Sequence, residues 1–214
     1  HKGINKIVFT GSTPTGQRIM SAASGNLKRL TLELGGNDAA IVLPNSDVQA
    51  FAQGLFQTSF INMGQTCAAL KRLYVHESQY EEVCQALTEI AQSQCVGAGL
   101  EEGVTFGPVQ NLNQFNKVQE LIDDAVAQGA KVLTGGKPVS DEGYLFPPTI
   151  VANVSNGIRL VDEEQFGPVL PVIPYQTVEQ AIQLANDSDI GPGGRGWGRD
   201  TETDQTERGI TKPR

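Results

Sequence analysis

The sequence predicts an α/β fold in which short buried strands alternate with amphipathic helices. Two observations carry this prediction: short apolar runs are bounded by glycine or proline, and between them lie longer segments with apolar residues three and four positions apart. The chain has 214 residues, of which 39% are hydrophobic and 19% charged, so it can bury a substantial core. Regular alternation of strands and helices is typical of a sheet covered by helices.

The first part of the chain predicts a strand, a turn and a helix. The apolar run at residues 6–10 ends in a glycine-containing turn at residues 11–16, and a helix is expected from Gln17. Further strands are expected over residues 27–34, 39–43, 71–75, 131–133 and 169–173. This order places a strand-turn-helix unit before the main run of elements.

The expected helices have recognisable start and stop signals. Three Ser or Thr residues stand three positions before Gln or Glu, which is the pattern of a capping box: Ser46 with Gln49, Ser78 with Glu81, and Thr177 with Gln180. Another helix is expected over residues 112–126, and Gly129 is expected to end it. From about residue 191 the chain is rich in glycine and then in charge, so an irregular tail is expected.

Charge and composition argue against several classes of partner. The net charge is −8 and the isoelectric point is near 4.8, whereas nucleic-acid-binding surfaces gather Lys and Arg. No apolar window is long enough for a bilayer, and the start of the chain lacks a secretory pattern, so no membrane partner and a cytoplasmic location are expected. Three cysteines without a recognisable spacing predict reduced thiols, and two histidines without an acidic cluster predict no metal site.

Cys67 is the cysteine in the best position for chemistry. It follows a predicted helix in a loop of small residues, where a thiol can be both reachable and solvated by backbone groups. The alternative is a small buried hydrophobic residue, which is the commoner role of a lone cysteine. Cys84 is expected in that role, because it lies on the apolar face of its helix. Cys95 stands at a helix end without a neighbouring motif.

Other polar residues allow two interpretations each. Glu33 interrupts an apolar strand, so it is either a functional carboxylate or a residue that faces water from an edge strand. Glu163 and Glu164 are either a solvated pair or part of a site beside a tight turn. The turn at residues 11–16 could hold a phosphate or simply join a strand to a helix. His76 could serve Cys67 as a base in a thiol hydrolase, although a structural or exposed histidine is commoner at a strand end.

Four segments, taken in order and spacing, resemble the NAD(P)-dependent aldehyde dehydrogenase superfamily. They are Phe-Thr-Gly-Ser-Thr at 9–13, Leu-Glu-Leu-Gly-Gly-Asn at 32–37, Gly-Gln-Thr-Cys at 64–67 with Arg72, and Glu-Glu-Gln-Phe-Gly-Pro-Val at 163–169. The resemblance extends to about Arg199. It implies that residues 1–35 are the C-terminal remnant of a Rossmann-like dinucleotide-binding domain and residues 36–214 a truncated catalytic domain with an irregular tail. The family's N-terminal region, with its oxyanion-binding asparagine, is then expected outside this sequence.

The resemblance also implies a role for particular residues. Cys67 is expected as the nucleophile and Glu33 as the base that activates the hydrolytic water. Residues implied to bind the cofactor, NAD or NADP, are Gly11, Ser12, Leu34, Lys117, Glu164 and Phe166. Residues implied to line the aldehyde tunnel are Phe60, Ile61, Met63, Thr66 and Ala68.

The implied reaction is oxidation of an aldehyde to a carboxylic acid through a cysteine thiohemiacetal and a thioester. The implied partners are a small aldehyde and, for the parent protein, other copies in a homodimer or homotetramer. The main alternative is a non-catalytic fragment or pseudo-enzyme of the same fold. An acylating dehydrogenase is disfavoured by the presence of Glu33. Lys71 and Arg72 could favour an acidic aldehyde, but a structural role for Arg72 and a strand start at Lys71 are the simpler interpretation.

Overall fold

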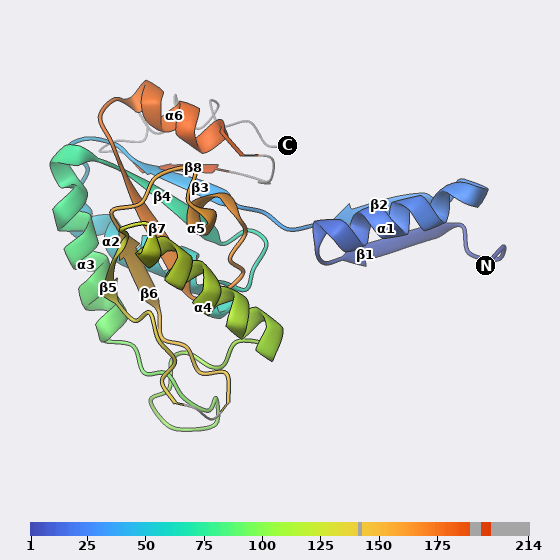
Figure 1. Ribbon diagram of the computed structural model, residues 1–214, viewed down its shortest axis with the longest axis horizontal. Coiled ribbons are helices and arrows are strands. Elements are labelled where there is room, and N and C mark those ends of the chain that lie inside the picture. The colour runs from blue at the N-terminus through green and yellow to red at the C-terminus, as the bar shows by residue number, and fades with distance from the viewer. Residues whose placement is uncertain (141–142, 189–193, 198–214) are drawn as a thin grey trace. The chain divides into compact units, whose positions relative to one another are not determined.

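The computed structural model describes residues 1–140, 143–188 and 194–197. The chain divides into two compact units, the first spanning His1–Gly36 and the second beginning at Asn37 (Figure 1). Among the described residues, no helix is both long enough and apolar enough to cross a bilayer. The α/β class predicted from the sequence is confirmed.

The first unit is a pair of parallel strands joined by a helix. Strand β1 (Lys6–Thr10) pairs with β2 (Arg29–Glu33), and α1 (Thr13–Ala23) connects them, followed by a short 3-10 turn at Ser24–Asn26. The strand at residues 6–10 is confirmed. The helix begins at Thr13 rather than Gln17, because a proline in the first helical turn needs no backbone donor there.

The second unit is built on a six-stranded sheet in the order β5-β6-β7-β4-β3-β8. Only β5 runs antiparallel to its neighbour; the other pairings are parallel. The strands are β3 (Asp38–Val42), β4 (Leu70–His76), β5 (Lys131–Thr134), β6 (Thr149–Ala152), β7 (Val169–Tyr175) and β8 (Gly194–Trp197). Strands β4 and β7 are buried on both faces, as expected for the centre of such a sheet.

Helices cover both faces of this sheet (Figure 1). They are α2 (Val48–Phe60), α3 (Tyr80–Gln92), α4 (Leu112–Ala127), α5 (Arg159–Asp162) and α6 (Val178–Asn186). Helices α2 and α3 pack in one apolar cluster with Leu73 and Val75 of β4, whereas α4, α5 and α6 pack in a second cluster with Tyr74. Since successive residues of β4 enter different clusters, the sheet separates two cores.

Two of the three predicted capping boxes are wrong. Asp47, not Ser46, caps α2 by accepting from the Ala50 N–H, while the Ser46 hydroxyl donates to the Leu43 carbonyl at 2.6 Å. Helix α3 begins after a 3-10 turn at Glu77–Gln79, whose cap is His76. The third prediction is confirmed, because the Thr177 side chain accepts from the Gln180 N–H. The helix over residues 112–126 and the left-handed Gly129 after it are also confirmed.

The expected irregular tail is wrong for part of its length. Residues 194–197 form β8, which pairs in parallel with β3. Main-chain pairing with a buried neighbouring strand can organise a glycine-rich segment that has no sequence signal of its own. The rest of the expected tail, residues 191–193 and 198–214, lies outside the described residues. Strand β6 and helix α5 are elements that the sequence did not predict.

Candidate functional site

Three connections that carry motif residues meet at one edge of the larger sheet. Cys67 precedes β4, Glu164 and Phe166 precede β7, and Asn37 precedes β3. Because β3, β4 and β7 are parallel neighbours, their amino ends lie at the same edge. Ligands in open α/β sheets usually lie beyond the carboxyl ends of the strands. The candidate nucleophile of this chain therefore lies at the opposite edge.

The Cys67 loop is held against the loop at residues 163–168 by a glycine-to-glycine contact. After α2, the chain passes through left-handed conformations at Asn62, Met63 and Gly64. A Cβ at Gly64 would lie 2.3 Å from the Gly167 carbonyl oxygen, and a Cβ at Gly167 would lie 2.3 Å from Cγ2 of Val118 in α4. The two loop backbones can approach this closely because Gly64 lacks a side chain, and the 163–168 loop can lie against α4 because Gly167 lacks one.

Cys67 itself lies in a short turn and its side chain is exposed. The turn is closed by a hydrogen bond from the Ala69 N–H to the Thr66 carbonyl at 3.1 Å. The preceding loop is fixed from both sides, since Gln65 donates to the Asn62 carbonyl at 3.1 Å and its side-chain oxygen accepts from the Gln110 N–H at 2.7 Å. The thiol is therefore presented on an ordered loop.

Lys71, for which a strand start was the simpler interpretation than contact with an acidic aldehyde, is a buried cation of this region. Lys71 is 2% exposed. Its Nζ donates to the carbonyls of Thr66 at 2.7 Å, Cys67 at 3.1 Å and Ala69 at 3.4 Å. Nζ also lies 3.6 Å from Oε1 of Glu164. The sequence signal was a charged residue beside Arg72 at the beginning of an apolar strand, and it was interpreted as the start of that strand.

The charge on Lys71 is balanced by its surroundings. Burial lowers the pKa of the Lys71 ammonium, and the negative charges of Glu164, Asp38 and Cys67 oppose that shift. The ammonium also lies 5.9 Å from the centre of the Phe166 ring, which is within the range of a cation–π contact. Lys71 therefore links the candidate nucleophile to both predicted cofactor residues of the 163–168 loop.

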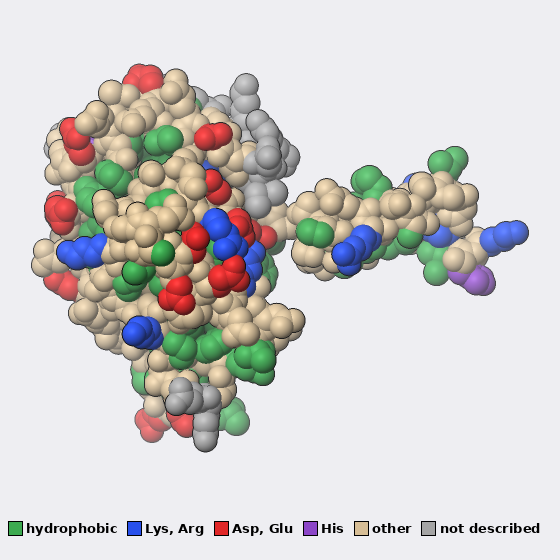
Figure 2. All heavy atoms as spheres, in the orientation of Figure 1, with side chains coloured by type: hydrophobic (Ala, Val, Ile, Leu, Met, Phe, Trp, Pro, Cys, Tyr) green, Lys and Arg blue, Asp and Glu red, His purple; other side chains and the backbone are tan. Residues whose placement is uncertain are grey.

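The two adjacent glutamates have separate environments, so they are not a solvated pair. Glu163 accepts from Nε of Arg159 at 2.6 Å, and the guanidinium lowers the pKa of the Glu163 carboxyl. The Glu164 side chain is 19% exposed and faces Lys71. Lys117 donates to the backbone carbonyl of Glu164 at 2.9 Å. Figure 2 shows acidic and basic side chains grouped on the face that carries α4 and α5.

Gln165 anchors the same loop from inside. It is 1% exposed, and its amide donates to the carbonyls of Lys71 at 2.8 Å and Leu160 at 3.0 Å. Phe166 has a left-handed backbone with φ 47°, which costs free energy for a residue with a side chain. The loop thus holds Phe166 in an unfavourable conformation between a buried amide and the glycine contact.

In the first unit, Gly11, Ser12 and Glu33 gather at the carboxyl edge of the two-stranded sheet. Thr10 pairs with Glu33, and the Gly11 N–H donates to the Glu33 carbonyl at 3.0 Å. The Glu33 side chain is exposed. Ser12 occupies the N-cap position of α1, whose first turn carries no acidic residue. An N-terminus of this kind, open and without negative charge, suits an anionic phosphate.

Leu34 packs directly on the helix of the first unit. A Cβ at Gly16 would lie 2.6 Å from Cδ2 of Leu34, so a larger residue at position 16 would displace the Leu34 side chain from α1. The local geometry thus brings together four of the predicted residues, Gly11, Ser12, Glu33 and Leu34. It is a strand-turn-helix arrangement that can accept a dinucleotide phosphate.

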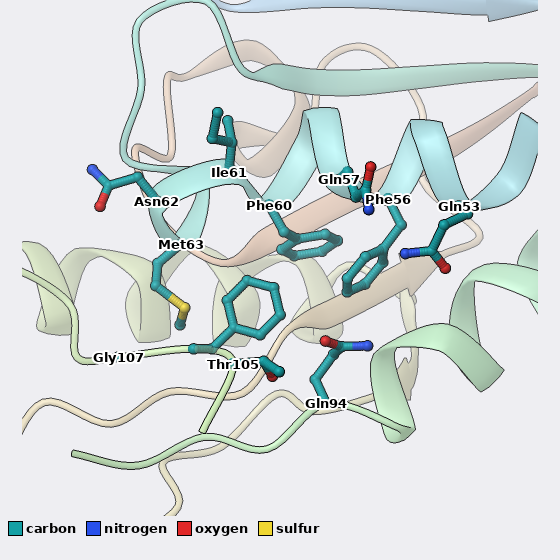
Figure 3. Close-up of a pocket in the computed structure, with 11 residues that line it drawn as sticks. Gln53, Phe56, Gln57, Phe60, Ile61, Asn62, Met63, Gln94, Thr105 and Gly107 are labelled. Carbon is teal, nitrogen blue, oxygen red and sulfur yellow. The ribbon is translucent and has the colours of Figure 1, made fainter. Parts of the chain in front are cut away.

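The predicted tunnel residues separate into two groups. Phe60, Ile61 and Met63 belong to the lining of a 530 Å³ cavity at the end of α2. Figure 3 shows the rings of Phe60 and Phe56 close together, whereas Ile61 points away from them. Thr66 and Ala68 instead lie on either side of Cys67 and are not part of that lining. The lining of this cavity therefore includes three of the five residues and does not include Cys67.

The remaining candidates have structural explanations. His76 ends β4, whereas Cys67 precedes it, so about 20 Å of strand separates them. The imidazole is also engaged, with Nδ1 2.8 Å from the Ser78 hydroxyl and Nε2 3.1 Å from the Gln176 carbonyl. Cys84 is buried, as predicted. All three cysteines are free, and no group of metal-binding side chains occurs within the described residues.

Comparison with known proteins identifies the family. The sequence model of the Aldehyde dehydrogenase family matches residues 1–207, and the chain belongs to this family. It is 42% identical over 188 residues to the mitochondrial succinate-semialdehyde dehydrogenase of Oryza sativa, covering 88% of this chain and 36% of that protein.

Solved structures give the same result. The NAD+ complex of an aldehyde dehydrogenase from Bacillus cereus is 36% identical with a TM-score of 0.95, and the match covers 100% of this chain and 43% of that one. A mutant of aldehyde dehydrogenase C from Pseudomonas syringae, in complex with NAD+ and octanal, is 33% identical with a TM-score of 0.95 and is covered to 44%. The chain therefore spans about two fifths of the length of these proteins.

Proposed function

We propose that the protein containing this chain oxidises an aldehyde to a carboxylic acid with NAD+ or NADP+, with Cys67 as the nucleophile and Glu33 as the general base. The observation that carries this proposal is the contact of Gly64 with Gly167, which places the exposed thiol loop beside the loop of Glu164 and Phe166. The relatives solved with NAD+, one of them also with octanal, support the cofactor and the substrate class.

The proposed chemistry begins at Cys67. Its thiolate adds to the aldehyde carbon, which forms a carbon–sulfur bond and turns the carbonyl oxygen into an oxyanion. The Cys67 backbone N–H is the group of this chain proposed to bind that oxyanion. When bound, the nicotinamide supplies the acceptor for the hydride that leaves the same carbon. The product at Cys67 is a thioester.

Glu33 is proposed to complete the reaction. Its carboxylate takes a proton from water, the hydroxide attacks the thioester carbon, and the carbon–sulfur bond breaks to release the acid and regenerate the thiolate. The exposed position of Glu33 at the end of β2 suits a group that must reach water. Cysteine suits the first step because the thioester it forms is readily hydrolysed. A carboxylate suits the second step because it can accept the proton of the attacking water.

The chain's own residues fit a dinucleotide in two places. The open N-terminus of α1 at Ser12, beside Gly11, suits the pyrophosphate, and the Leu34 carbonyl is proposed to hold the carboxamide. Glu164 is proposed to accept from the nicotinamide ribose, with Lys117 beside it, and Phe166 to pack beside the ring. Phe60, Ile61, Met63, Thr66 and Ala68 are proposed to line the path of the aldehyde.

Two further properties are proposed for the parent protein. We infer a homodimer or homotetramer and a cytoplasmic location, with residues 1–35 serving the cofactor and the remainder carrying the thiol. Sedimentation of the intact protein would test the oligomeric state, and fractionation of the cells that produce it would test the location.

Nicotinamide reduction by the 214-residue chain tests the proposal. The chain is assayed with a panel of aldehydes and with NAD+ or NADP+, beside Cys67→Ala and, as a matched control, Cys95→Ala, which removes the other exposed thiol. Aldehyde-dependent reduction that survives Cys95→Ala and is lost in Cys67→Ala is expected. Unchanged reduction in Cys67→Ala would contradict the proposal, and a folded chain without turnover would favour the non-catalytic alternative.

A further inference from the structure

The ammonium of Lys71 meets the backbone of the candidate nucleophile loop at three points. It donates to the carbonyls of Thr66, Cys67 and Ala69, all within 3.4 Å. We propose that Lys71 is the positioning residue of Cys67. Its hydrogen bonds hold the turn that presents the thiol, and its positive charge favours the thiolate. The negative charge of Glu164 reduces the electrostatic effect of Lys71 on the Cys67 sulfur. This inference rests on the proposed role of Cys67 as the nucleophile.

The holding function follows from the number of donors. A lysine ammonium has three N–H groups, and three carbonyls of one short turn lie within hydrogen-bond distance of it, beside the Glu164 carboxylate. The three carbonyl oxygens share one buried cation as their donor, so removal of Lys71 would take a hydrogen bond from each of them. Lys71 itself is fixed by its place in β4 and by Gln165, whose amide donates to the Lys71 carbonyl at 2.8 Å. The turn is therefore tied to the centre of the sheet.

The electrostatic function follows from the charges that surround the ammonium. Glu164, from the loop before β7, lies 3.6 Å from Nζ; Asp38, from β3, and Cys67 also interact with it through their charges. A cation beside a thiol favours the thiolate, which is the nucleophilic form. A carboxylate beside the same cation opposes that effect. The two groups should consequently act on Cys67 with opposite signs.

The opposite signs distinguish positioning from simple support of the fold. Lys71→Met removes the cation and its hydrogen bonds but keeps the length of the side chain, so Cys67 should react more slowly. Glu164→Gln removes only the negative charge, so Cys67 should react faster. Lys71→Arg keeps the charge and should recover most of the rate that Lys71→Met loses. A purely structural Lys71 would not produce an increase in Glu164→Gln.

Thiol alkylation measures this without any turnover. The chain is treated with iodoacetamide between about pH 6 and pH 10, a range that covers the usual titration of a thiol, and each cysteine is followed by peptide mass spectrometry. Exposed Cys95 is an internal control for reagent and pH, and buried Cys84 reports unfolding. Because no aldehyde or cofactor is present, a failure here is distinguishable from a failure of the proposed oxidation.

The expected result concerns the rate of Cys67 divided by the rate of Cys95. At neutral pH this ratio should fall about three- to tenfold in Lys71→Met, with the pH profile of Cys67 displaced upward, and should rise in Glu164→Gln. An unchanged ratio in Lys71→Met, or a fall in both variants, would overturn the proposal. If Lys71→Met exposes Cys84, the sign of the change in Glu164→Gln decides alone, and a fall or no change there overturns it.

Discussion

Two neighbouring cations at the start of β4, Lys71 and Arg72, lead to different regions of the second unit, because successive side chains of a strand point to opposite faces. Both residues are almost completely buried. Lys71 donates to the turn that carries Cys67 and faces Glu164. Arg72 donates to the Asn37 carbonyl at 2.8 Å and to the Ala185 carbonyl, near the end of α6, at 3.0 Å.

The Arg72 region is a closed structural network. The guanidinium also lies 3.2 Å from the Tyr74 hydroxyl, which donates to Asn156 at 3.0 Å. The guanidinium donates to neutral oxygens, and these hydrogen bonds tie the start of β3 to the last turn of α6. Cations near the C-terminus of a helix are favourable, because the helix dipole places partial negative charge there.

The difference shows that burial of a cation does not define its role. Arg72 is surrounded by parts of the fold that have no predicted chemistry, whereas Lys71 contacts an exposed thiol loop and a carboxylate of the cofactor loop. The possible preference for an acidic aldehyde, raised from the sequence of these two residues, has no support from positions in which both are buried and engaged. Stability should therefore depend more on Arg72, and thiol chemistry more on Lys71.

The largest loss of stability is expected for Arg72→Met. Removal of the guanidinium takes the N–H donors away from the buried carbonyls of Asn37 and Ala185, which should lower the free energy of unfolding by about 3 kcal/mol. Denaturant titration of the chain measures this. The ratio of the Cys67 alkylation rate to the Cys95 alkylation rate should remain that of the unchanged chain. A fall in this ratio would show that Arg72 also affects the thiol and that the two cations do not have separate roles.

A smaller loss is expected for Gly64→Ala, on the Lys71 side. The left-handed backbone and the 2.3 Å approach to the Gly167 carbonyl should together cost about 2 kcal/mol or more. Gly99→Ala is the matched control, because nothing lies within 4 Å of its Cβ position. Equal melting temperatures for the two variants would show that the glycine contact does not hold the loops together.

Lys71→Met should cost less stability than Arg72→Met. Burial already opposes the charge of Lys71, as the lowered pKa of its ammonium indicates, so removal of the charge recovers part of what the lost hydrogen bonds cost. The expected decrease in the free energy of unfolding is about 1 kcal/mol. A decrease larger than that of Arg72→Met in the same titration would mean that Lys71, and not Arg72, contributes more to the stability of the fold.

A pH effect on stability should appear on the α2 and α3 side of the sheet, at Cys84. Burial raises the pKa of the Cys84 thiol to about 12 from an ordinary 9.0. The unfolded thiol therefore loses its proton first, so this contribution to stability is complete below pH 9.0 and is lost as the pH rises toward 12.

The contribution of Cys84 to the free energy of unfolding should accordingly fall by up to about 1.4 kcal/mol per pH unit in this window. Cys84→Ala should show a shallower fall, although Tyr80, whose pKa is raised to about 12 by burial, leaves part of it in place. Urea titrations at several alkaline pH values measure the two slopes. Identical slopes would mean that folding does not raise the pKa of the Cys84 thiol.

The sequence predicted most strands, the buried Cys84 and the helix with its glycine end, because these depend on local patterns of apolar residues. It missed Asp47 and His76 as caps, since neighbouring polar residues compete for the same role and only the backbone geometry decides. It missed β8, in which two of the four residues are glycine and which is formed by pairing with β3.

For the candidate site, the motifs located the thiol loop and the glutamate loop but not the cation between them. Lys71 contacts residues four and five positions earlier in the chain and one 93 positions later, and no local pattern contains the second contact. The spacing of motifs also could not show that Phe60 and Met63 line a cavity whose lining leaves out Thr66 and Ala68, because the chain between them turns through left-handed conformations at residues 62–64.

The most direct test of Cys67 as the nucleophile is to capture the thioester. Glu33→Gln should leave the first half of the reaction intact and slow hydrolysis, so incubation of this variant with an aldehyde and NAD+ should accumulate an acyl group on one cysteine. Peptide mass spectrometry should find the acyl group on Cys67 and not on Cys95 or Cys84. Aldehyde-dependent nicotinamide reduction accompanied by acylation at another residue, or persisting in Cys67→Ala, would contradict the account.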